Sequence, residues 1–373
     1  MKKNWITIGI IIIAVLAIAL IVVQTKREPR QIRIGVILPL TGNAAKYGVW
    51  TKEGMEIALE EVRENYPKYK FQLIFEDDGG KPEQAVSAMN KLIKFDKVPV
   101  VIGVIQSPTA LAVAPIAEKE KIVMLSTGAS AEKLKDAGDY IFRIREGSKI
   151  HGEKAAQEAL SISNKCGVIF LNAENGVSYA DEFKKYYEKS GGIIEIWEAY
   201  NEGEKDFRSY LAKLKEKNIK VVYIPGLVTE IALLLKQAKE IGNQATFISS
   251  VGAQNPKLLE IAKEAAEGLI YTYPYFDPSS KDINERIKSF LEKYVQKYGY
   301  EPDFLAANGY DAIKLLAKVT VENGYSADAI KEGLYKIEGF EGIGGNFYFD
   351  EYGEVIKPVI VKYVKDQNFE IRR

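Results

Sequence analysis

Two short loops rich in hydroxyl side chains lie close together in the sequence, and each directly follows an apolar segment. The first loop, QSPT at residues 106–109, comes after the apolar segment 98–104, and the second, STGAS at residues 126–130, comes after segment 122–125. A strand–helix–strand unit places its strands parallel, so both loops would leave the same edge of a sheet. That edge, at the carboxyl ends of the strands, is where open α/β sheets bind ligands. The two loops therefore predict a binding site for a small anion.

The first loop also carries the signals of a helix start. Ser107 is a good N-cap residue, and Pro108 has its backbone φ angle preset for the first helical turn. The N–H groups of Thr109 and Ala110 would point out of the helix start, where the helix dipole favours an anion. A simpler interpretation is that Ser107 only caps its own helix, and the two roles are compatible. Neither loop has a base beside its hydroxyl groups in the sequence, so we expect binding and not catalysis.

Charge and composition exclude several classes of protein. Lysine and arginine together number 51, as do aspartate and glutamate, whereas a nucleic-acid-binding protein normally carries a basic excess. One cysteine, Cys166, and one histidine, His151, cannot form an internal disulfide, a zinc site or a usual Ser–His or Cys–His pair. We therefore expect no enzyme activity, no metal and no cofactor. We expect Cys166 to be a small buried side chain and His151 to be a partly exposed residue at a helix start.

The N-terminal segment is apolar from Trp5 to Val23 and follows Lys2 and Lys3. At about 1.5 Å per residue, a helix of this length would cross most of a hydrocarbon core about 30 Å thick. An uncleaved membrane anchor is our preferred interpretation, and a cleaved secretory signal is the alternative. No cysteine follows the run, which excludes lipid attachment at a lipobox. We expect residues 1–30 to anchor the body outside the cell membrane; with a cleaved signal the protein would be secreted or periplasmic.

The body alternates between segments typical of buried strands and segments typical of helices. The first unit begins with the continuous apolar strand IRIGVIL at residues 32–38, and the alternation restarts near Ser148. Long helical segments and a hairpin-like β segment follow toward the C-terminal end. Two successive α/β units predict two lobes joined by several crossings, with a cleft between the lobes where ligand pockets tend to form.

Several motifs, in this order, resemble the leucine/isoleucine/valine-binding protein family. They are GVILPLTGNAAKYG, EDDGGKPEQAV, VIGVIQSPTALAVAP, STGAS, GEKDFRSYLAKLKEKNIKVVYI, AAEGL and FYFDEYGEV. The resemblance covers residues 31–373. It implies the α/β fold of type I periplasmic binding proteins, with two lobes, three crossovers and an interlobe cleft, here preceded by the N-terminal membrane helix. Residues 31–147 with 277–348 would form lobe 1, and residues 148–276 with 349–373 would form lobe 2.

The resemblance also implies which residues would hold a ligand. In the family the two hydroxyl-rich loops grip the ligand's α-carboxylate, and the matching groups here are the Ser107 hydroxyl, the Gly128 backbone and the Ser130 hydroxyl. The family's aromatic wall matches Tyr47 and Tyr179, for which ordinary packing is the alternative. With the neighbouring loop positions added, the candidate ligand-binding residues are Tyr47, Gln106, Ser107, Gly128, Ser130, Tyr179 and Val251.

Two departures from the family concern the ligand's ammonium group. Family members that bind amino acids place one acid near the position of Ser148, and another in the loop where this chain has Ser249, Ser250, Val251 and Gly252. A buried ammonium group without an anionic partner is costly. Three interpretations stay open: Glu146 or Glu174 supplies the missing charge, the ligand is a carboxylate without an ammonium group, or the ligand is neutral and polar.

The resemblance implies an extracytoplasmic solute-binding protein of an ABC importer. The ligand would be a branched-chain amino acid or a related small carboxylate, held in the cleft by hinge closure. The closed protein, expected to be a monomer, would then dock on an ABC permease in the membrane, and no nucleic acid is expected as a partner. The alternative is a receptor of the same fold that binds a small acid or amide and signals to a partner protein.

Overall fold

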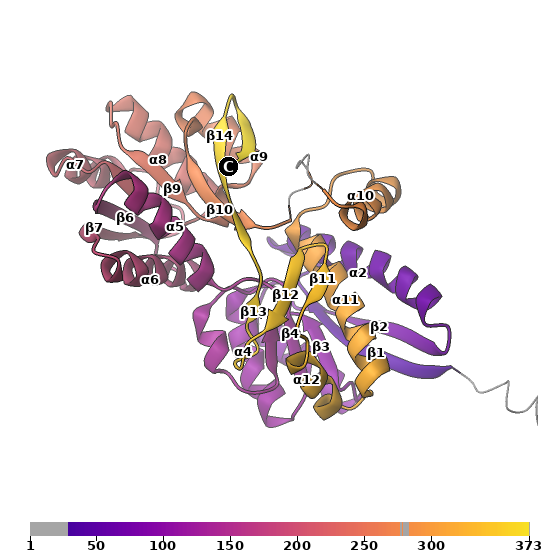
Figure 1. Ribbon diagram of the computed structural model, residues 1–373. Coiled ribbons are helices and arrows are strands. Elements are labelled where there is room, and N and C mark those ends of the chain that lie inside the picture. Colours follow the sequence, from indigo (N-terminus) through magenta and orange to yellow (C-terminus); the bar gives the residue numbers. More distant parts are fainter. Residues whose placement is uncertain (1–28, 277, 279–282, 373) are drawn as a thin grey trace, which may run out of the picture.

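The computed structural model describes residues 29–276, 278 and 283–372, which form two lobes (Figure 1). Each lobe is a β-sheet with helices on both of its faces. The membrane helix expected in residues 1–28 lies outside the described residues. Within the described ranges, no helix combines the length and the apolar character that a membrane span requires.

The strands of the first sheet are all parallel and follow the order β2-β1-β3-β4-β5. Every residue of β3 and β4 is buried. This matches their sequences, because helices on both faces of a parallel sheet leave no side for polar residues. The strands of this sheet are β1 (Arg30–Leu38), β2 (Tyr69–Asp77), β3 (Val100–Gly103), β4 (Val123–Ser126) and β5 (Ile141–Arg143).

The helices of this lobe, which we call lobe 1, are α2 (Ala45–Asn65), α3 (Pro82–Lys94), α4 (Ser107–Lys119), the 3-10 turn η1 (Glu132–Asp136), α10 (Glu285–Tyr298), α11 (Phe304–Asn323) and α12 (Ala327–Tyr335). One face of the sheet packs against α2, α11 and α12 through side chains such as Met55 and Leu316. The other face packs against α3 and α4 through side chains such as Met89 and Val113. Helix α10 lies outside this layer, against α2.

The second sheet follows the order β15-β14-β10-β9-β8-β6-β7, and only β14, which runs antiparallel to both β10 and β15, breaks its parallel direction. Strands β14 and β15 form a tight hairpin. Its turn residues Asp366 and Gln367 both have positive φ, +50° and +59°, as a two-residue hairpin turn requires. The strands are β6 (Lys165–Leu171), β7 (Ile193–Tyr200), β8 (Val221–Tyr223), β9 (Thr246–Ser249), β10 (Ile270–Pro274), β14 (Val359–Lys365) and β15 (Asn368–Ile371).

The helices of this second lobe, lobe 2, are α5 (Ser148–Ile162), α6 (Glu174–Lys189), α7 (Arg208–Glu216), α8 (Val228–Glu240), η2 (Val251–Ala253), α9 (Pro256–Ala262) and η3 (Lys263–Ala266). Helices α5 and α6 cover one face of the sheet, where Ala156 and Phe183 pack on the strands. Helices α7, α8 and α9 cover the other face with side chains such as Leu211 and Leu234.

Cys166 and His151 both lie inside lobe 2. Cys166 is a buried free thiol among apolar side chains, as expected. His151 is fully buried, so the expectation of a partly exposed residue was wrong. The reason is its position on α5: His151, Ala155 and Ala159 recur every four residues, which places them on the helix face that packs on the sheet.

The chain crosses between the lobes after β5, after β10 and after β13. A small antiparallel sheet precedes the last crossing and packs on the core of lobe 1 through Phe347, Phe349 and Val355. The lobe boundaries expected from the sequence stay a prediction, and these contacts favour placing the last crossing after residue 356 instead of residue 348. The strands of this sheet are β11 (Phe340–Gly342), β12 (Gly345–Phe349) and β13 (Val355–Ile356).

Helices α2 and α11 run side by side in the same direction and approach very closely. A Cβ atom on Gly54 would lie 1.9 Å from the carbonyl oxygen of Ala306, and one on Gly309 would lie 2.4 Å from the carbonyl oxygen of Thr51. Farther along α2, Glu61 binds Lys314 of α11 at 2.9 Å. The two glycines therefore let α11 seat against α2, and both helices begin at the carboxyl edge of the sheet.

Replacing Gly54 with valine should destabilise the fold, because the new side chain would displace the backbone of α11. Overpacking of this kind lowers the free energy of unfolding by about 1–3 kcal/mol, or more where backbone must move. Urea denaturation of the purified protein measures the change. Gly339→Ala is the matched control, since a Cβ there would meet no atom within 4 Å, and we expect less than about 0.5 kcal/mol. Equal effects of the two substitutions would contradict the close contact.

Candidate functional site

The two hydroxyl-rich loops lie next to each other at the carboxyl ends of β3 and β4, as expected. Helix α4 begins at Ser107 with Gln106 as its N-cap, so Ser107 does not cap its own helix. Its Oγ instead accepts hydrogen bonds from the backbone N–H groups of Ser130, at 3.3 Å, and Ala131, at 3.1 Å. These two hydrogen bonds connect the first loop to the second. The hydroxyl hydrogen of Ser107 remains available as a donor.

Three hydrogen-bond donors of these loops have no acceptor among the residues that the structure describes. They are the hydroxyl of Ser107, the hydroxyl of Ser130 and the backbone N–H of Gly128. Ser107 and Ser130 are buried, and Gly128 is half-buried. A carboxylate, which only accepts hydrogen bonds, suits such a set of donors. We call Ser107, Gly128 and Ser130 the hydroxyl clamp.

Gly128 has a packing reason to be glycine. A Cβ atom there would lie 2.6 Å from the Cβ of Ile105 and 2.8 Å from its carbonyl oxygen. The loop is held on its other side by Ser126, whose hydroxyl donates to the carbonyl of Val104 at 2.9 Å and accepts from the N–H of Ala129 at 3.1 Å. The clamp is thus part of a rigid turn that the sheet positions.

Gln106 and Val251 are not part of the hydroxyl clamp in the structure. The side chain of Gln106 lies against Gly80 at the end of β2, where its Oε1 would be 2.7 Å from a Cβ on that glycine. Val251 opens the turn η2 at the carboxyl end of β9, in lobe 2, and is half-buried against the apolar cluster of that lobe. Val251 therefore lies at the edge of lobe 2 that corresponds to the clamp's edge in lobe 1.

The two candidate aromatic residues differ in exposure. Tyr47, in the first turn of α2, is 45% exposed and meets Trp50 edge-on with ring centroids 5.9 Å apart. Burial of its hydroxyl end and the neighbouring Asp303 raise the pKa of Tyr47. Tyr179, in α6, is buried, and its hydroxyl accepts a hydrogen bond from Arg145 at 3.2 Å. Tyr47 is thus available to a ligand, while the hydroxyl of Tyr179 already has a partner.

Arg145 joins the lobes at the first crossing. It is only 2% exposed, and its Nη1 binds Glu146 Oε2 at 2.8 Å. Its guanidinium stacks on Phe304 of α11, 4.6 Å from the ring centroid. Because it also binds Tyr179 of α6, Arg145 contacts a helix of each lobe. A second contact between the lobes is the ion pair of Lys133 with Glu174, at 3.1 Å.

Both acids that could serve as ammonium partners already face a cation. Glu146 is fully buried between Arg145 and Lys357; its Oε1 lies 3.4 Å from Lys357 Nζ and has no hydrogen-bond partner among the described residues. Glu174 is paired with Lys133. Ser148 lies beside the clamp, since its N–H donates to the carbonyl of Ser130 at 3.2 Å, but it brings no charge.

A buried polar chain connects the last crossing to the clamp. Lys357, which is 3% exposed, donates from Nζ to Asn308 Oδ1 at 2.9 Å. Asn308 in turn donates from Nδ2 to the carbonyl of Thr127, also at 2.9 Å. Through Glu146 the same lysine reaches the first crossing. Two of the three crossings therefore share one network with the loop that carries Gly128 and Ser130.

His151 lies under this junction, and its ring forms no hydrogen bond or ion pair with an acidic side chain of the described residues. Its Nδ1 is 3.0 Å from Thr272 Oγ1, and its ring meets that of Tyr179 edge-on at 5.6 Å. Burial, together with the nearby Arg145 and Lys357, lowers the pKa of His151 well below its usual value. The imidazole is therefore neutral. No cluster of metal-ligating side chains exists among the described residues.

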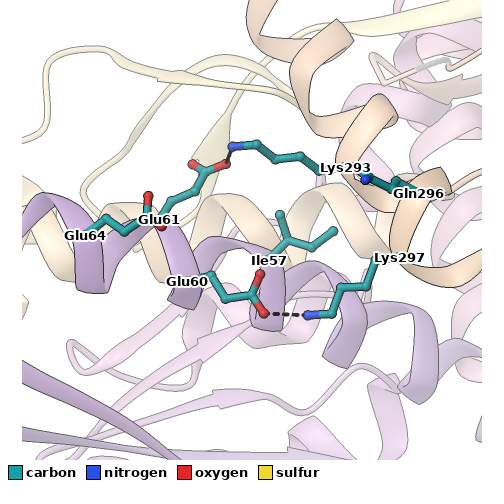
Figure 2. Close-up of a pocket in the computed structure, with 7 residues that line it drawn as sticks. All are labelled: Ile57, Glu60, Glu61, Glu64, Lys293, Gln296 and Lys297. Carbon is teal, nitrogen blue, oxygen red and sulfur yellow. Dashed lines mark hydrogen bonds and ion pairs between the residues drawn. The ribbon is translucent and has the colours of Figure 1, made fainter.

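A groove of about 450 Å³ lies elsewhere, between α2 and α10 (Figure 2). Four of its charged side chains point toward one another in pairs across the groove: Glu60 binds Lys297 and Glu61 binds Lys293, both at 2.7 Å. Since these charges already pair with each other, the groove presents little to a ligand. We interpret it as a surface seam between two helices and not as the binding site.

The polar groups missed by the sequence predictions are Arg145, Asp303, Asn308 and Lys357. Asp303 has a recognisable signal, because an aspartate before an apolar periodic segment is typical of a helix N-cap. That signal places a helix start but not its neighbours. Arg145, Asn308 and Lys357 have no local signal, since they meet only when three segments far apart in the chain come together.

Replacing Lys357 with methionine should leave Glu146 short of one partner and Asn308 without its donor. Removing one member of a buried ion pair lowers the free energy of unfolding by about 3–5 kcal/mol. Chemical denaturation measures this loss, and adding Glu146→Gln should restore part of it. The control is Lys133→Met, which breaks the exposed pair with Glu174 and should cost less than about 1 kcal/mol. Similar losses in both single variants would argue against a special role for the buried network.

Comparison with known proteins agrees with this architecture. Residues 31–368 match the family profile of periplasmic binding proteins. The leucine-, isoleucine-, valine-, threonine- and alanine-binding protein of Pseudomonas aeruginosa is 30% identical over 332 residues, 87% of each chain. Leu/Ile/Val-binding protein homolog 1 of Brucella abortus is 30% identical over 336 residues, 88% of this chain and 89% of its own.

A solved leucine binding protein from Thermotoga maritima superposes with a TM-score of 0.80 at 29% identity, covering 92% of this chain and 98% of that chain. An ABC transporter substrate-binding protein from Desulfitobacterium hafniense, in complex with Leu, gives a TM-score of 0.79 at 25% identity over 92% of this chain and 100% of that chain. The expected type I fold with two α/β lobes is confirmed. This chain belongs to the periplasmic binding protein family, among the relatives of the branched-chain amino acid-binding proteins.

Proposed function

We propose that this protein captures a small carboxylate, with branched-chain amino acids as the leading candidates, between its lobes and delivers it to an ABC permease. The observation that carries the proposal is the hydroxyl clamp. Ser107, Gly128 and Ser130 present three donors at the carboxyl edge of the lobe 1 sheet, and none has an acceptor among the described residues. A ligand carboxylate would accept all three.

Neutral donors suit a protein that must also release its ligand. A hydrogen bond to a charged group contributes about 1.5–3 kcal/mol, so three of them give useful affinity without a permanently buried cation. The rigid turn around Gly128 adds to this, because donors that are already in place lose little conformational entropy on binding.

Closure of the lobes would follow from contacts on both sides. A ligand shifts an equilibrium between open and closed forms only if it binds one form better, so it must touch both lobes. Tyr47 offers an exposed ring on the lobe 1 side, and Val251 and Tyr179 are the candidates on the lobe 2 side. The three crossings would serve as the hinge.

The relatives support an amino acid as ligand and a location outside the cytoplasm. The Pseudomonas aeruginosa relative is named for binding leucine, isoleucine, valine, threonine and alanine, and the Desulfitobacterium hafniense structure holds Leu. A periplasmic or other extracytoplasmic location fits this family. The apolar residues 5–23 would supply either the export signal or an anchor.

A thermal-shift screen of the full chain, purified in detergent, tests the proposal. The panel holds the common amino acids and their deaminated acids. A ligand present at about 100 times its Kd should stabilise the folded state by about 2.7 kcal/mol and raise the melting temperature measurably. Failure of every compound at millimolar concentration would contradict the proposal.

Ser130→Ala should weaken binding of any compound that the screen finds. Its hydroxyl has no partner among the described residues, so the substitution leaves the fold intact while it removes one donor from the clamp. We expect a loss of about 10- to 150-fold in affinity, measured by titration calorimetry. The exposed Ser190→Ala in lobe 2 serves as control and should bind like the wild type. Unchanged affinity in the Ser130 variant would remove the clamp from the site.

A further inference from the structure

Asp303 carries a carboxylate oxygen that the fold does not use. It is the N-cap of α11, where its Oδ1 accepts from the N–H groups of Leu305, at 2.8 Å, and Ala306, at 3.3 Å. Its Oδ2 has no hydrogen-bond or ion-pair partner among the described residues, and the residue is partly exposed. One oxygen thus holds the helix start while the other stays available.

The neighbours of Asp303 place it in front of the hydroxyl clamp. It interacts electrostatically with Lys46 and Tyr47, which follow β1, and with Arg145, which follows β5. In the sheet order β2-β1-β3-β4-β5, the strands between β1 and β5 are β3 and β4, whose ends carry the two loops of the clamp. Because Asp303 faces residues that follow β1 on one side and β5 on the other, it lies over the carboxyl ends of β3 and β4.

A direct contact of the same helix supports this placement. Asn308, little more than one helical turn beyond Asp303, donates to the carbonyl of Thr127, the residue before Gly128. Helix α11 thus starts at the sheet's carboxyl edge with its first turn near the second loop. Since α11 runs parallel to α2, Asp303 projects at the same end as Tyr47.

The charges around Asp303 leave it short of a partner. Lys46 and Arg145 are the cations that face it from α2 and from the first crossing, yet neither forms an ion pair with it. Arg145 is already bound to Glu146 and Tyr179. Burial raises the pKa of Asp303 to about 7 in spite of these cations and of its two backbone donors. A cationic group at Oδ2 would stabilise the ionised carboxylate.

We infer that Asp303 accepts a hydrogen bond from a protonated amine of the ligand while the hydroxyl clamp holds the ligand's carboxylate. The inference deepens the proposed function and rests on it, because it requires a ligand that binds at the clamp. It selects small zwitterions, the amino acids, over plain carboxylates and neutral polar compounds. It also accounts for the acids that are absent near Ser148 and in the loop 249–252, since Glu146 and Glu174 each form an ion pair and Asp303 forms none among the described residues.

Titration calorimetry with matched probes on the full chain tests the role of Asp303. The probes are L-leucine, L-isoleucine and L-valine with the deaminated acids 4-methylpentanoate, 3-methylpentanoate and 3-methylbutanoate, and 5-aminopentanoate, whose amine lies at the far end, with its amine-free counterpart pentanoate. The wild type should bind at least one zwitterion at least tenfold more tightly than its amine-free counterpart. Tighter binding of an α-amino acid would place the ligand's α-amine at Asp303, and tighter binding of 5-aminopentanoate would place a terminal amine there.

Asp303→Asn is the test variant, because asparagine is an equally good N-cap and keeps the helix start. It should lose at least tenfold in affinity for the preferred zwitterion and stay within about threefold for the deaminated acids. Asp206→Asn is the matched control: Asp206 also accepts a backbone N–H at a helix start, that of Arg208 at 3.1 Å, but lies exposed in lobe 2. It should bind every probe like the wild type.

The pH dependence gives a second readout. Only the ionised carboxylate attracts an ammonium group, so affinity of the wild type for the zwitterion should rise by up to about tenfold from pH 6 to pH 8. Asp303→Asn should lack this rise. Lys46, Tyr47 and Arg145 are the other ionisable groups that face Asp303, and the pKa values of Tyr47 and Arg145 are both raised, away from this range.

The outcomes separate the two proposals. Equal losses for zwitterions and deaminated acids in Asp303→Asn, or no loss for either, would overturn the role of Asp303 and leave carboxylate binding in place. If no zwitterion binds the wild type more tightly than its amine-free counterpart, the role of Asp303 is overturned as well. If none of the probes binds the wild type, the proposed function fails for this ligand class and the inference fails with it.

Discussion

Buried charge at the junction of the lobes is the constraint on which the rest of the structure depends. Arg145, Glu146 and Lys357 are almost fully removed from water, and a buried charge that loses its partner destabilises a fold by several kcal/mol. Because Glu146 belongs to the first crossing and Lys357 to the last, their ion pair keeps these two segments side by side. The first and last crossings are thus held together at one point, around which we expect any movement of the lobes to turn.

The same network sets the position of the candidate binding loop. Lys357 donates a hydrogen bond to Asn308, and Asn308 donates one to the carbonyl of Thr127, directly before Gly128. On the other side, Ser107 accepts from the backbone of Ser130. The donors that would face a carboxylate are therefore supported both by the sheet edge and by the hinge. This arrangement would let a change at the ligand reach the crossings through a short chain of direct hydrogen bonds.

The sequence was sufficient for the features that are local. Apolar strands followed by hydroxyl-rich loops predicted the parallel sheet and the neighbouring positions of Ser107 and Ser130, because strand order and loop edge follow from the βαβ pattern. It was insufficient where partners come from distant segments. The buried face of His151 depended on how α5 seats on the sheet, and the partner of Ser107 proved to be the second loop instead of its own helix. Asp303 had a local signal only for its capping role, since its neighbours Tyr47 and Arg145 lie far away in the chain.

The two lobes differ in the polar groups that they leave available to a ligand. Lobe 1 supplies the clamp donors and the uncommitted oxygen of Asp303, whereas two polar side chains of lobe 2 at the junction already bind lobe 1: Tyr179 binds Arg145, and Glu174 binds Lys133. These contacts hold the lobes together without a ligand, and opening must break them. Exposed pairs such as Lys133–Glu174 contribute less than about 1 kcal/mol, so the opening cost lies mainly in the buried contact of Arg145. A ligand held by lobe 1 then favours the closed form even if it binds that form only modestly more tightly than the open form. Such a modest preference is compatible with release of the ligand to a partner that separates the lobes.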